Sequence, residues 1–362
     1  MRIFILATAA TEGGALSILK DYLSLVHEDG NDYTICVNEN IKGTIQEGRN
    51  FSFIFVDTKS WVKRLTFDFF KIKTLINQHD CDVCINFQNI PVKTNAIQIV
   101  YVHQPIPFSN VQFPLNSLDN IKLWLYKIFY GKMINFNKSY AEHFIVQTEW
   151  MKNALCEQNI AKCSNISIIR PEVSILQSVI KKPSEYVCDN IFFYPAARYS
   201  YKNHTIVIKA MGLLGSRFLQ ENSVKVVFTL NASEVPELIQ EAKLLGVEDF
   251  IEYTGQLTRE EVMRLYSDSK ALVFPSRLET FGMPLAEAAM FNIPIIVSDE
   301  LYSKEVLNGY KYAVYCDSLD STEWANAIKH VLTIKCEESQ VEFKVKSKWS
   351  DVYAIINNLL SD

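Results

Sequence analysis

One segment in the second half of the chain decides the fold, and over residues 274–289 it reads FPSRLETFGMPLAEAA. A short apolar run at residues 271–274 leads into this segment and predicts a buried strand. Helical spacing follows over residues 284–291, and Pro284 suits the first turn of a helix because no amide donor is needed there. The segment therefore predicts a strand, a loop and a helix in succession.

The loop and the helix start carry groups that can bind a ligand. The amides of Phe281, Gly282 and Met283 would point out of the helix N-terminus, which is a ready site for an anion. Glu287 lies about one turn further on, where its two oxygens can accept both hydroxyls of a ribose. Glu279 lies in the loop, where it can reach a sugar held beside a diphosphate. A plain alternative stays open, in which Glu279 caps amides and Glu287 is a solvated helix residue stabilised by roughly 0.3–1 kcal/mol.

Alternating strands and helices extend from this segment in both directions. In the second half, strands are predicted at residues 191–195, 224–230, 250–253, 271–274 and 294–297, and helices at 205–213, 235–245, 259–267 and 284–291. In the first half, strands are predicted at residues 2–8, 33–37, 51–56, 83–87, 97–102 and 144–146, with a helix at 15–26. Such alternation predicts an α/β fold with mostly parallel sheets and helices on both faces.

The 362 residues are enough for two domains of ordinary size. Both halves have a Rossmann-like pattern, and residues 170–184 between them show no periodicity. We predict an N-terminal domain over residues 1–175 and a C-terminal domain over 176–345, with the amphipathic segment 346–362 joining the first domain. Ligands of such sheets bind beyond the carboxyl ends of the strands, so two facing domains would offer a central cleft.

The composition excludes several classes of protein. Hydrophobic residues make up 48% and charged residues 21%, as in ordinary globular domains. A formal net charge of -5 argues against nucleic acid as a partner. The apolar residues 3–10 fit a buried first strand better than a signal peptide, and no run reaches the roughly 18 apolar residues of a membrane span. These features predict a cytoplasmic protein.

The cysteines and histidines predict neither disulfides nor a metal site. Eight cysteines are scattered without a disulfide-like framework, as expected in a reducing compartment. The closest pair, Cys81 and Cys84, fits two small apolar residues of a strand better than a redox or zinc pair, because no second pair stands at zinc spacing. Aspartates and histidines form no dense cluster of ligands, so no metal cofactor is expected.

Glu279 and Glu287, with seven residues between them and Phe-Gly inside, resemble the E-x7-E motif of the retaining, family-4 type glycosyltransferases (glycosyl transferases group 1), which have the GT-B fold. The resemblance implies that Glu287 binds the donor ribose and that Glu279 contacts the donor sugar near the reacting carbon. It also implies that the amides of Phe281, Gly282 and Met283 face the donor.

A second resemblance lies upstream, where residues 193–204 read FYPAARYSYKNH. It implies that Arg198 and Lys202 hold the diphosphate of the donor. The leaving nucleotide diphosphate gains negative charge as the glycosidic bond breaks, and one preorganised contact of this kind is typically worth about 3–4 kcal/mol. The turn at residues 253–257 resembles the family segment beside the base and phosphates, which assigns Gly255 to the donor site.

Two segments of the first half complete the resemblance. Residues 12–15 read EGGA and resemble the family's first loop, which implies that Gly13 and Gly14 approach the donor phosphates; they are not a dinucleotide fingerprint, since G-x-G-x-x-G is absent. His103 follows a predicted strand and resembles the histidine that meets the donor sugar. Residues 147–150 resemble a polar turn to which we give a structural role.

The chain departs from the family pattern at two places. Residues 170–173 read RPEV where an Asn-Gly-Val-Asp type of turn is usual, and residues 201–203 read YKN where Pro-Lys-Gly is commoner. These departures leave the hinge and the phosphate geometry open, but not the reaction class.

Two basic, aromatic stretches match no catalytic motif: residues 59–73, and residues 122–138 with Lys122, Lys127, Lys132 and Lys138. An amphipathic helix of this kind can rest on an anionic membrane surface. The alternative is that its aromatic side chains lie in the core and its lysines in water.

Together, the resemblance implies transfer of a hexose-type sugar from a nucleotide-diphosphate donor to a glycan or lipid-linked acceptor, with retention of configuration. Synthesis of a surface polysaccharide, such as lipopolysaccharide O-antigen or capsule, at the inner face of the membrane is the expected setting. Two alternatives stay open: a non-catalytic partner subunit that binds a nucleotide sugar, and a nucleotide-sugar epimerase.

Overall fold

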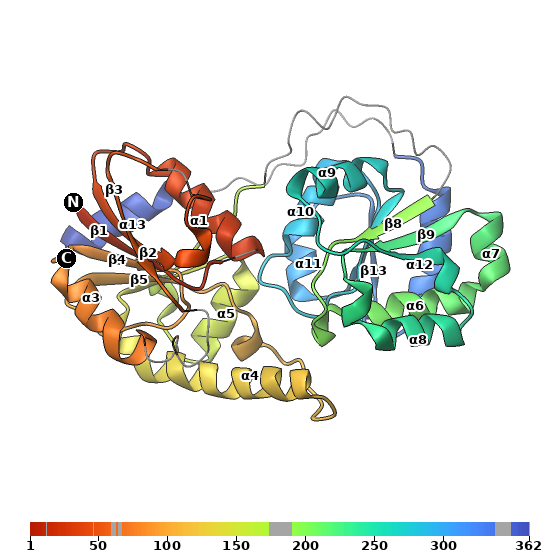
Figure 1. Cartoon of the computed structure of the whole chain (residues 1–362), viewed down its shortest axis with the longest axis horizontal. Helices are drawn as coiled ribbons and strands as arrows, with labels where there is room; N and C mark the ends of the chain where they lie inside the picture. Colours follow the sequence, from red (N-terminus) through yellow and green to blue (C-terminus); the bar gives the residue numbers. More distant parts are fainter. Residues whose placement is uncertain are drawn as a thin grey trace. The chain divides into compact units, whose positions relative to one another are not determined.

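The chain folds into two compact units in the computed structural model (Figure 1). The first unit comprises Met1–Glu172 and Lys346–Asp362, and the second comprises Val173–Val345. The structure describes residues 1–11, 13–45, 47–58, 63, 67–173, 190–336 and 349–361. The predicted division between residues 175 and 176 lies outside the described residues.

A seven-stranded parallel sheet forms the centre of the first unit, with strand order β3-β2-β1-β4-β5-β6-β7. Its strands are β1 (Arg2–Ala7), β2 (Asp32–Asn38), β3 (Phe51–Val56), β4 (Val83–Asn86), β5 (Ile97–Tyr101), β6 (His143–Val146) and β7 (Ile166–Ile168). Its helices are α1 (Gly13–Leu25), α3 (Ile72–Gln78), α4 (Leu118–Asn137), α5 (Glu149–Glu157) and α13 (Asp351–Ser361). A π-helical turn, Phe67–Lys71, leads into α3.

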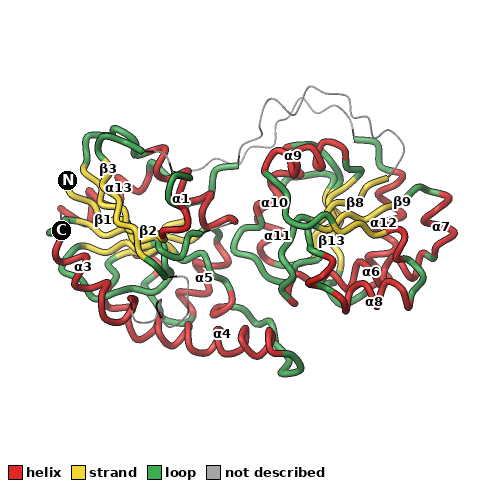
Figure 2. The backbone as a smooth tube through the Cα atoms, in the orientation of Figure 1, coloured by secondary structure: helices red, strands yellow, loops and turns green. Residues whose placement is uncertain are grey.

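The second unit has a six-stranded parallel sheet with strand order β10-β9-β8-β11-β12-β13. Its strands are β8 (Asn190–Tyr194), β9 (Val224–Phe228), β10 (Ile251–Tyr253), β11 (Ala271–Phe274), β12 (Ile295–Ser298) and β13 (Ala313–Cys316). Its helices are α6 (His204–Leu214), α7 (Ser216–Glu221), α8 (Pro236–Leu244), α9 (Arg259–Asp268), α10 (Met283–Met290), α11 (Leu301–Val306) and α12 (Ser321–Thr333). In both units helices lie on each side of the strands (Figure 2).

The predicted α/β fold with two Rossmann-like sheets is confirmed. The strands predicted at residues 51–56 and 271–274 form with these bounds. Strands buried on both faces read as near-continuous apolar runs, which is why β1 and β11 could be located from the sequence. In each sheet the strand order reverses at one point, between β1 and β4 and between β8 and β11. Such switch points are where ligands of open α/β sheets bind.

The last helix packs into the core of the first unit. Trp349, just before α13, and Val352 and Ile356 within it are buried in one cluster with residues of α1 and of the first strands. Trp349 lies 5.3 Å from Tyr22 and from Tyr101 between ring centroids. Figure 1 shows α13, in blue, beside the red and orange elements of this unit.

The structure tests two expectations about the cysteines: that Cys81 and Cys84 are strand residues, and that the chain has no disulfides. Cys84 is buried in β4 and carries a free thiol, in agreement with an apolar strand residue, whereas Cys81 lies before the strand. The structure joins Cys156 and Cys163 in a disulfide, so the expectation of no disulfides is wrong for this pair. Their Cα atoms lie 5.6 Å apart because the short turn after α5 folds back on the helix end.

Candidate active site

The loops after β8 and β11 meet at the switch point of the second sheet. The two strands pair directly, with Ala271 beside Phe192, so both loops leave the same edge of the sheet. The backbone amide of Arg277 donates a hydrogen bond of 2.8 Å to the carbonyl of Tyr201, which ties one loop to the other. The segments predicted to hold the diphosphate and the sugar are therefore neighbours in space.

An ion pair links these two loops. The ammonium of Lys202 lies 2.5 Å from Oε1 of Glu279, and both side chains are 15% exposed. The same ammonium lies 5.5 Å from the ring centroid of Tyr201 and 6.0 Å from that of Phe274, so aromatic faces also attract it. The carboxylate of Glu279 balances the charge of this ammonium, and the surrounding contacts fix the position of the ammonium.

Buried tyrosines fix the backbone on either side of this pair. The hydroxyl of Tyr194 donates to the carbonyl of Lys202 at 2.7 Å, and the hydroxyl of Tyr302 donates to the carbonyl of Ser276 at 2.6 Å. Burial raises the pKa of both phenols well above the ordinary value. They therefore remain protonated donors, and the two loops keep their course.

The N-terminus of α10 opens at the same edge. Gly282 precedes the helix with a φ of 82°, in the left-handed region that favours glycine. Phe281 is buried and anchors the loop, and the amide of Leu285 donates to the carbonyl of Gly282 at 2.9 Å. Pro284 has no amide hydrogen and the amide of Leu285 is already bonded, so the amides of Gly282 and Met283 are the ones suited to an anion.

Glu287 lies inside the second unit rather than in solvent, so the alternative of a solvated helix residue is wrong. It is 4% exposed. Its Oε2 accepts a 2.9 Å hydrogen bond from the hydroxyl of Tyr266, and its Oε1 lies 2.5 Å from Nη1 of Arg259. Because an ionised carboxylate offers about four acceptor positions, two remain for other donors.

Arg259 is a site residue that the sequence motifs do not reveal. It is the first residue of α9, which begins with a capping box between Thr258 and Glu261. This cap places Arg259 near the carboxyl edge of the sheet, 28 positions from its carboxylate partner. The cap could have located the helix start, but no sequence signal pairs Arg259 with Glu287.

The remaining residues assigned to the second unit lie on strand-end loops. Arg198 is exposed in the loop after β8, four positions before Lys202. Gly255 follows β10 with a φ of 74°, and its amide donates to the carbonyl of Leu230 at 3.0 Å. A Cβ atom at Gly255 would lie 2.7 Å from Oδ1 of Asn231, so this close turn requires glycine.

The first unit places its assigned residues at the edge of its own sheet. Gly13 and Gly14 begin α1 after β1, and Gly13 has a φ of 59°. Glu12 lies outside the described residues. His103 follows β5; its amide donates to Oδ1 of Asn89 at 2.7 Å, and its ring stacks on Tyr101 at 5.6 Å. Their roles toward a donor stay predictions.

Two cavities, of about 740 and 690 Å³, belong to the first unit and not to the loops just described. The assignment of the donor site therefore rests on side-chain contacts and strand-end position, not on a cavity. Within the ranges that the structure describes, no three histidine, cysteine or acidic side chains are grouped so as to hold a metal ion.

His204 gives the stability of the second unit a specific pH dependence. It begins α6, lies between the rings of Tyr194 and Phe228, and burial lowers its pKa to about 3. The unfolded chain binds this proton below about pH 6.5, whereas the folded chain does not until about pH 3. Stability should thus fall as the pH falls through this window, by up to about 1.4 kcal/mol per pH unit.

Urea unfolding between pH 4 and pH 7 measures this contribution. His204→Phe should flatten the dependence, while the change of an exposed histidine, His330→Phe, should leave it as in the unaltered chain. Equal slopes for all three proteins would contradict the assignment of this dependence to His204.

Comparison with known proteins agrees with this geometry. Residues 177–348 match the family model described as glycosyl transferases group 1. The match covers 172 of the 362 residues, nearly all of them in the second unit. The matched residues include both strand-end loops, the Lys202–Glu279 pair and Glu287. The chain is also similar to the "O-antigen chain mannosyltransferase RfbU" of Salmonella typhimurium, with 26% identity over 251 residues.

The similarity covers only part of the curated relatives. The match spans 69% of this chain and 64% of the Salmonella protein. A serotype-specific mannosyltransferase, WbdA of Escherichia coli, is 23% identical over 241 residues, which is 64% of this chain and 28% of that protein. Among solved structures, Anabaena HepE with UDP-glucose superimposes with a TM-score of 0.70 at 14% identity, covering 100% of this chain and 99% of HepE. That likeness shows the GT-B fold.

Proposed function

We propose that this protein is a retaining glycosyltransferase that moves a hexose, mannose first among the candidates, from a nucleotide-diphosphate donor to a glycan or lipid-linked acceptor. The observation that carries the proposal is the Lys202–Glu279 pair at the switch point of the second sheet, beside the open N-terminus of α10. Mannose is suggested by the names of the Salmonella and Escherichia coli relatives. Synthesis of a surface polysaccharide such as O-antigen is the proposed setting.

The proposed chemistry uses fixed positive charge in place of a metal. As the bond between the sugar and the diphosphate breaks, charge grows on the leaving phosphate oxygens. Lys202, Arg198 and the first amides of α10 stabilise that charge, and electrostatic groups in place beforehand need no reorganisation. Glu279, released from Lys202 by the arriving diphosphate, accepts hydrogen bonds from the donor sugar. His103 contributes a second polar contact to the sugar.

Glu287 binds the ribose in this proposal. Tyr266 and Arg259 occupy one acceptor position on each of its oxygens, and the remaining positions accept the two ribose hydroxyls. Gly255 is assigned to the part of the site that binds the nucleotide base. Its close turn follows β10 and lies at the same edge of the sheet as the other site loops.

Activity should survive chelation. If Lys202, Arg198 and the α10 amides neutralise the diphosphate, addition of EDTA should change the transfer rate by less than about twofold, since no step uses a metal-bound oxygen. A rate that collapses in EDTA and returns with Mg²⁺ or Mn²⁺ would contradict this part of the mechanism.

The acceptor is assigned to the first unit, at or near a membrane surface. A cavity of about 690 Å³ there is lined by Lys73, Lys93 and Lys132 together with aromatic side chains of α4. Phe129 and Phe136 of α4 are 59% and 83% exposed, so the alternative that the aromatic residues lie in the core is wrong for these two. Exposed aromatic rings beside lysines suit the headgroup region of an anionic bilayer.

Vesicle flotation tests this membrane contact. The protein should float with vesicles rich in phosphatidylglycerol and remain at the bottom with neutral ones, and Lys132→Glu should weaken flotation by about half or more, since each basic residue contributes about 1 kcal/mol. Lys209→Glu on α6 of the second unit is a matched control that should float normally. No flotation, or flotation that Lys132→Glu does not alter, contradicts the contact. No helix among the described ranges is both long and apolar enough to cross a membrane.

A transfer assay separates the proposal from the two alternatives. The purified protein is incubated with UDP- and GDP-linked hexoses and with lipid extracts that contain polysaccharide precursors. The proposal predicts a glycosylated lipid or glycan and release of the nucleoside diphosphate. Binding without turnover would favour the partner subunit, and interconversion of the nucleotide sugar without acceptor would favour the epimerase.

A further inference from the structure

The six residues of the edge strand β3 include none of the charges or prolines that usually prevent pairing with another strand. Phe51–Val56 reads FSFIFV, six residues without charge or proline. The other edge strands, β7, β10 and β13, have three, three and four residues. The free amides and carbonyls of an exposed edge strand can form hydrogen bonds with another strand. Natural proteins prevent this with short edge strands, charges or proline. Among the described residues, no strand pairs with the outer side of β3.

The register of β3 shows which backbone groups face outward. It pairs with β2 in parallel, Tyr33 beside Phe51, and the amide of Tyr33 donates to the carbonyl of Asn50. In such a ladder alternate residues bond inward, so the amides and carbonyls of Phe51, Phe53 and Phe55 point away from the sheet. The amide of Phe51 is taken by the carbonyl of Gly48. Within the part of the chain that the structure describes, no backbone group bonds to the amides of Phe53 and Phe55 or to the three outward carbonyls.

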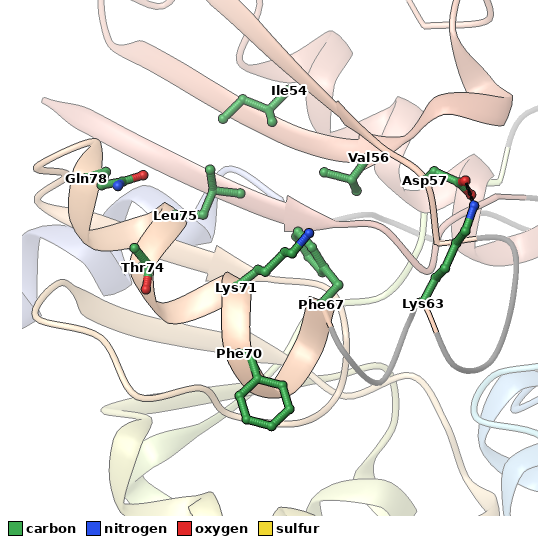
Figure 3. Close-up of a pocket in the computed structure, with 10 residues that line it drawn as sticks. All are labelled: Ile54, Val56, Asp57, Lys63, Phe67, Phe70, Lys71, Thr74, Leu75 and Gln78. Atoms are coloured by element: carbon green, nitrogen blue, oxygen red, sulfur yellow. Dashed lines mark hydrogen bonds and ion pairs between the residues drawn. The ribbon is translucent and has the colours of Figure 1, made fainter.

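Both faces of the sheet carry apolar side chains at this edge. On one face the rings of Phe51, Phe53 and Phe55 form a row, with centroids 6.2 and 5.8 Å apart and Phe55 39% exposed. On the other face a cavity of about 740 Å³ is lined by Ile54 and Val56 and by α3 side chains, among them Leu75 (Figure 3). A strand added to the edge would place its side chains over both surfaces.

We propose that a second copy of this chain pairs with β3 in antiparallel register, centred on Phe53. Phe53 then lies opposite Phe53 of the second copy, and Phe51 lies opposite Phe55. This register joins residues whose outward groups match, giving four backbone hydrogen bonds from the amides of Phe53 and Phe55. Its two-fold symmetry is the isologous arrangement of most homodimers.

Opposite charges favour this register over registers that are shifted along the strand. Arg49 lies four residues before Phe53 and is exposed, and Asp57 lies four residues after it. In the centred register each Arg49 therefore stands opposite Asp57 of the second copy, and both ends of the paired strands are closed by opposite charges. Asp57 forms an ion pair with Lys63 in the single chain, so Arg49 of the second copy would join or replace that contact.

A charge exchange tests the pairing. Light scattering after size-exclusion chromatography should give twice the chain mass for the unaltered protein at micromolar concentration. Arg49→Asp or Asp57→Arg places like charges opposite each other and should weaken dimerisation about tenfold or more. The double variant Arg49→Asp with Asp57→Arg should restore it. Within one chain the two residues lie beyond opposite ends of β3, whose six residues span about 20 Å, so restoration must act between copies.

Two further variants serve as controls, one for the folding of the chain and one for the effect of exchanging charges at another place. Phe55→Pro removes an outward donor and no bond to β2, so it should give a monomer with an unchanged circular dichroism spectrum. The exchange Arg217→Glu with Glu221→Arg reverses an exposed pair on α7 and should leave the dimer intact. A monomeric unaltered protein, or a dimer that the single charge variants do not weaken, overturns the proposal.

Discussion

Replacing Glu279 with glutamine should lower the rate of sugar transfer about 100- to 1,000-fold and leave the affinity for the nucleoside diphosphate within about threefold. The rate falls because glutamine keeps the shape of the side chain but loses the charge that contacts the donor sugar, and one preorganised contact in a transition state is worth about 3–4 kcal/mol. Affinity for the product diphosphate persists because Lys202, Arg198 and the amides at α10 still bind it.

Glutamine is the better substitution because of the contact with Lys202. The ammonium and the carboxylate are each 15% exposed, so alanine would leave a half-buried cation without its oxygen acceptor. The amide oxygen of glutamine still accepts a hydrogen bond from the ammonium. Glu252→Gln, an exposed position on β10, is the matched control and should transfer at the normal rate. If Glu279→Gln transfers sugar at the normal rate, the catalytic role assigned to Glu279 is wrong.

Lys202→Met should lower both the rate and the binding of the diphosphate. We expect kcat to fall about 100- to 1,000-fold, since growing charge on the leaving group loses its nearest side-chain cation. The affinity for the nucleoside diphosphate should also fall about tenfold or more, because a hydrogen bond to a charged group is worth about 1.5–3 kcal/mol. The contrast with Glu279→Gln, which spares binding, distinguishes a contact to the leaving group from a contact to the sugar.

Kinetics and calorimetry together measure this contrast. Lys209→Met, at an exposed position on the helix that follows Lys202, is the matched control and should resemble the unaltered enzyme. The double variant with Glu279→Gln tests coupling, since the two side chains touch and their effects should not add. Additive effects, or normal diphosphate affinity in Lys202→Met, would contradict the assigned role.

Much of the fold follows from sequence pattern alone, for physical reasons that differ between elements. β11 and the start of α10 are predictable because a buried parallel strand is continuously apolar and because Pro284 and Gly282 mark the helix start. The position of β3 in the chain is predictable, but its place at the edge of the sheet is not. The strand carries apolar residues on both faces, so it lacks a clear alternation of polar and apolar residues.

The residues of the candidate site can be predicted from sequence only where they lie in a short segment that matches a known motif. Glu279, Lys202 and Glu287 stand out because spacing and residue type coincide with a known motif. Arg259 does not, because its contact with Glu287 depends on how α9 lies against α10, which no local pattern encodes. The burial of Glu287 is equally a product of packing, and the local pattern alone suggested a solvated residue.

A crystal structure of the protein with UDP or GDP, whichever binds more tightly, would show whether these residues form the donor site. We expect a diphosphate in the second unit, with its oxygens about 2.7–3.2 Å from the ammonium of Lys202 and from an amide at the start of α10. The ribose hydroxyls should lie within the same distance of Glu287. A diphosphate bound elsewhere, with the Lys202–Glu279 pair untouched and Glu287 held only by Tyr266 and Arg259, would contradict the account.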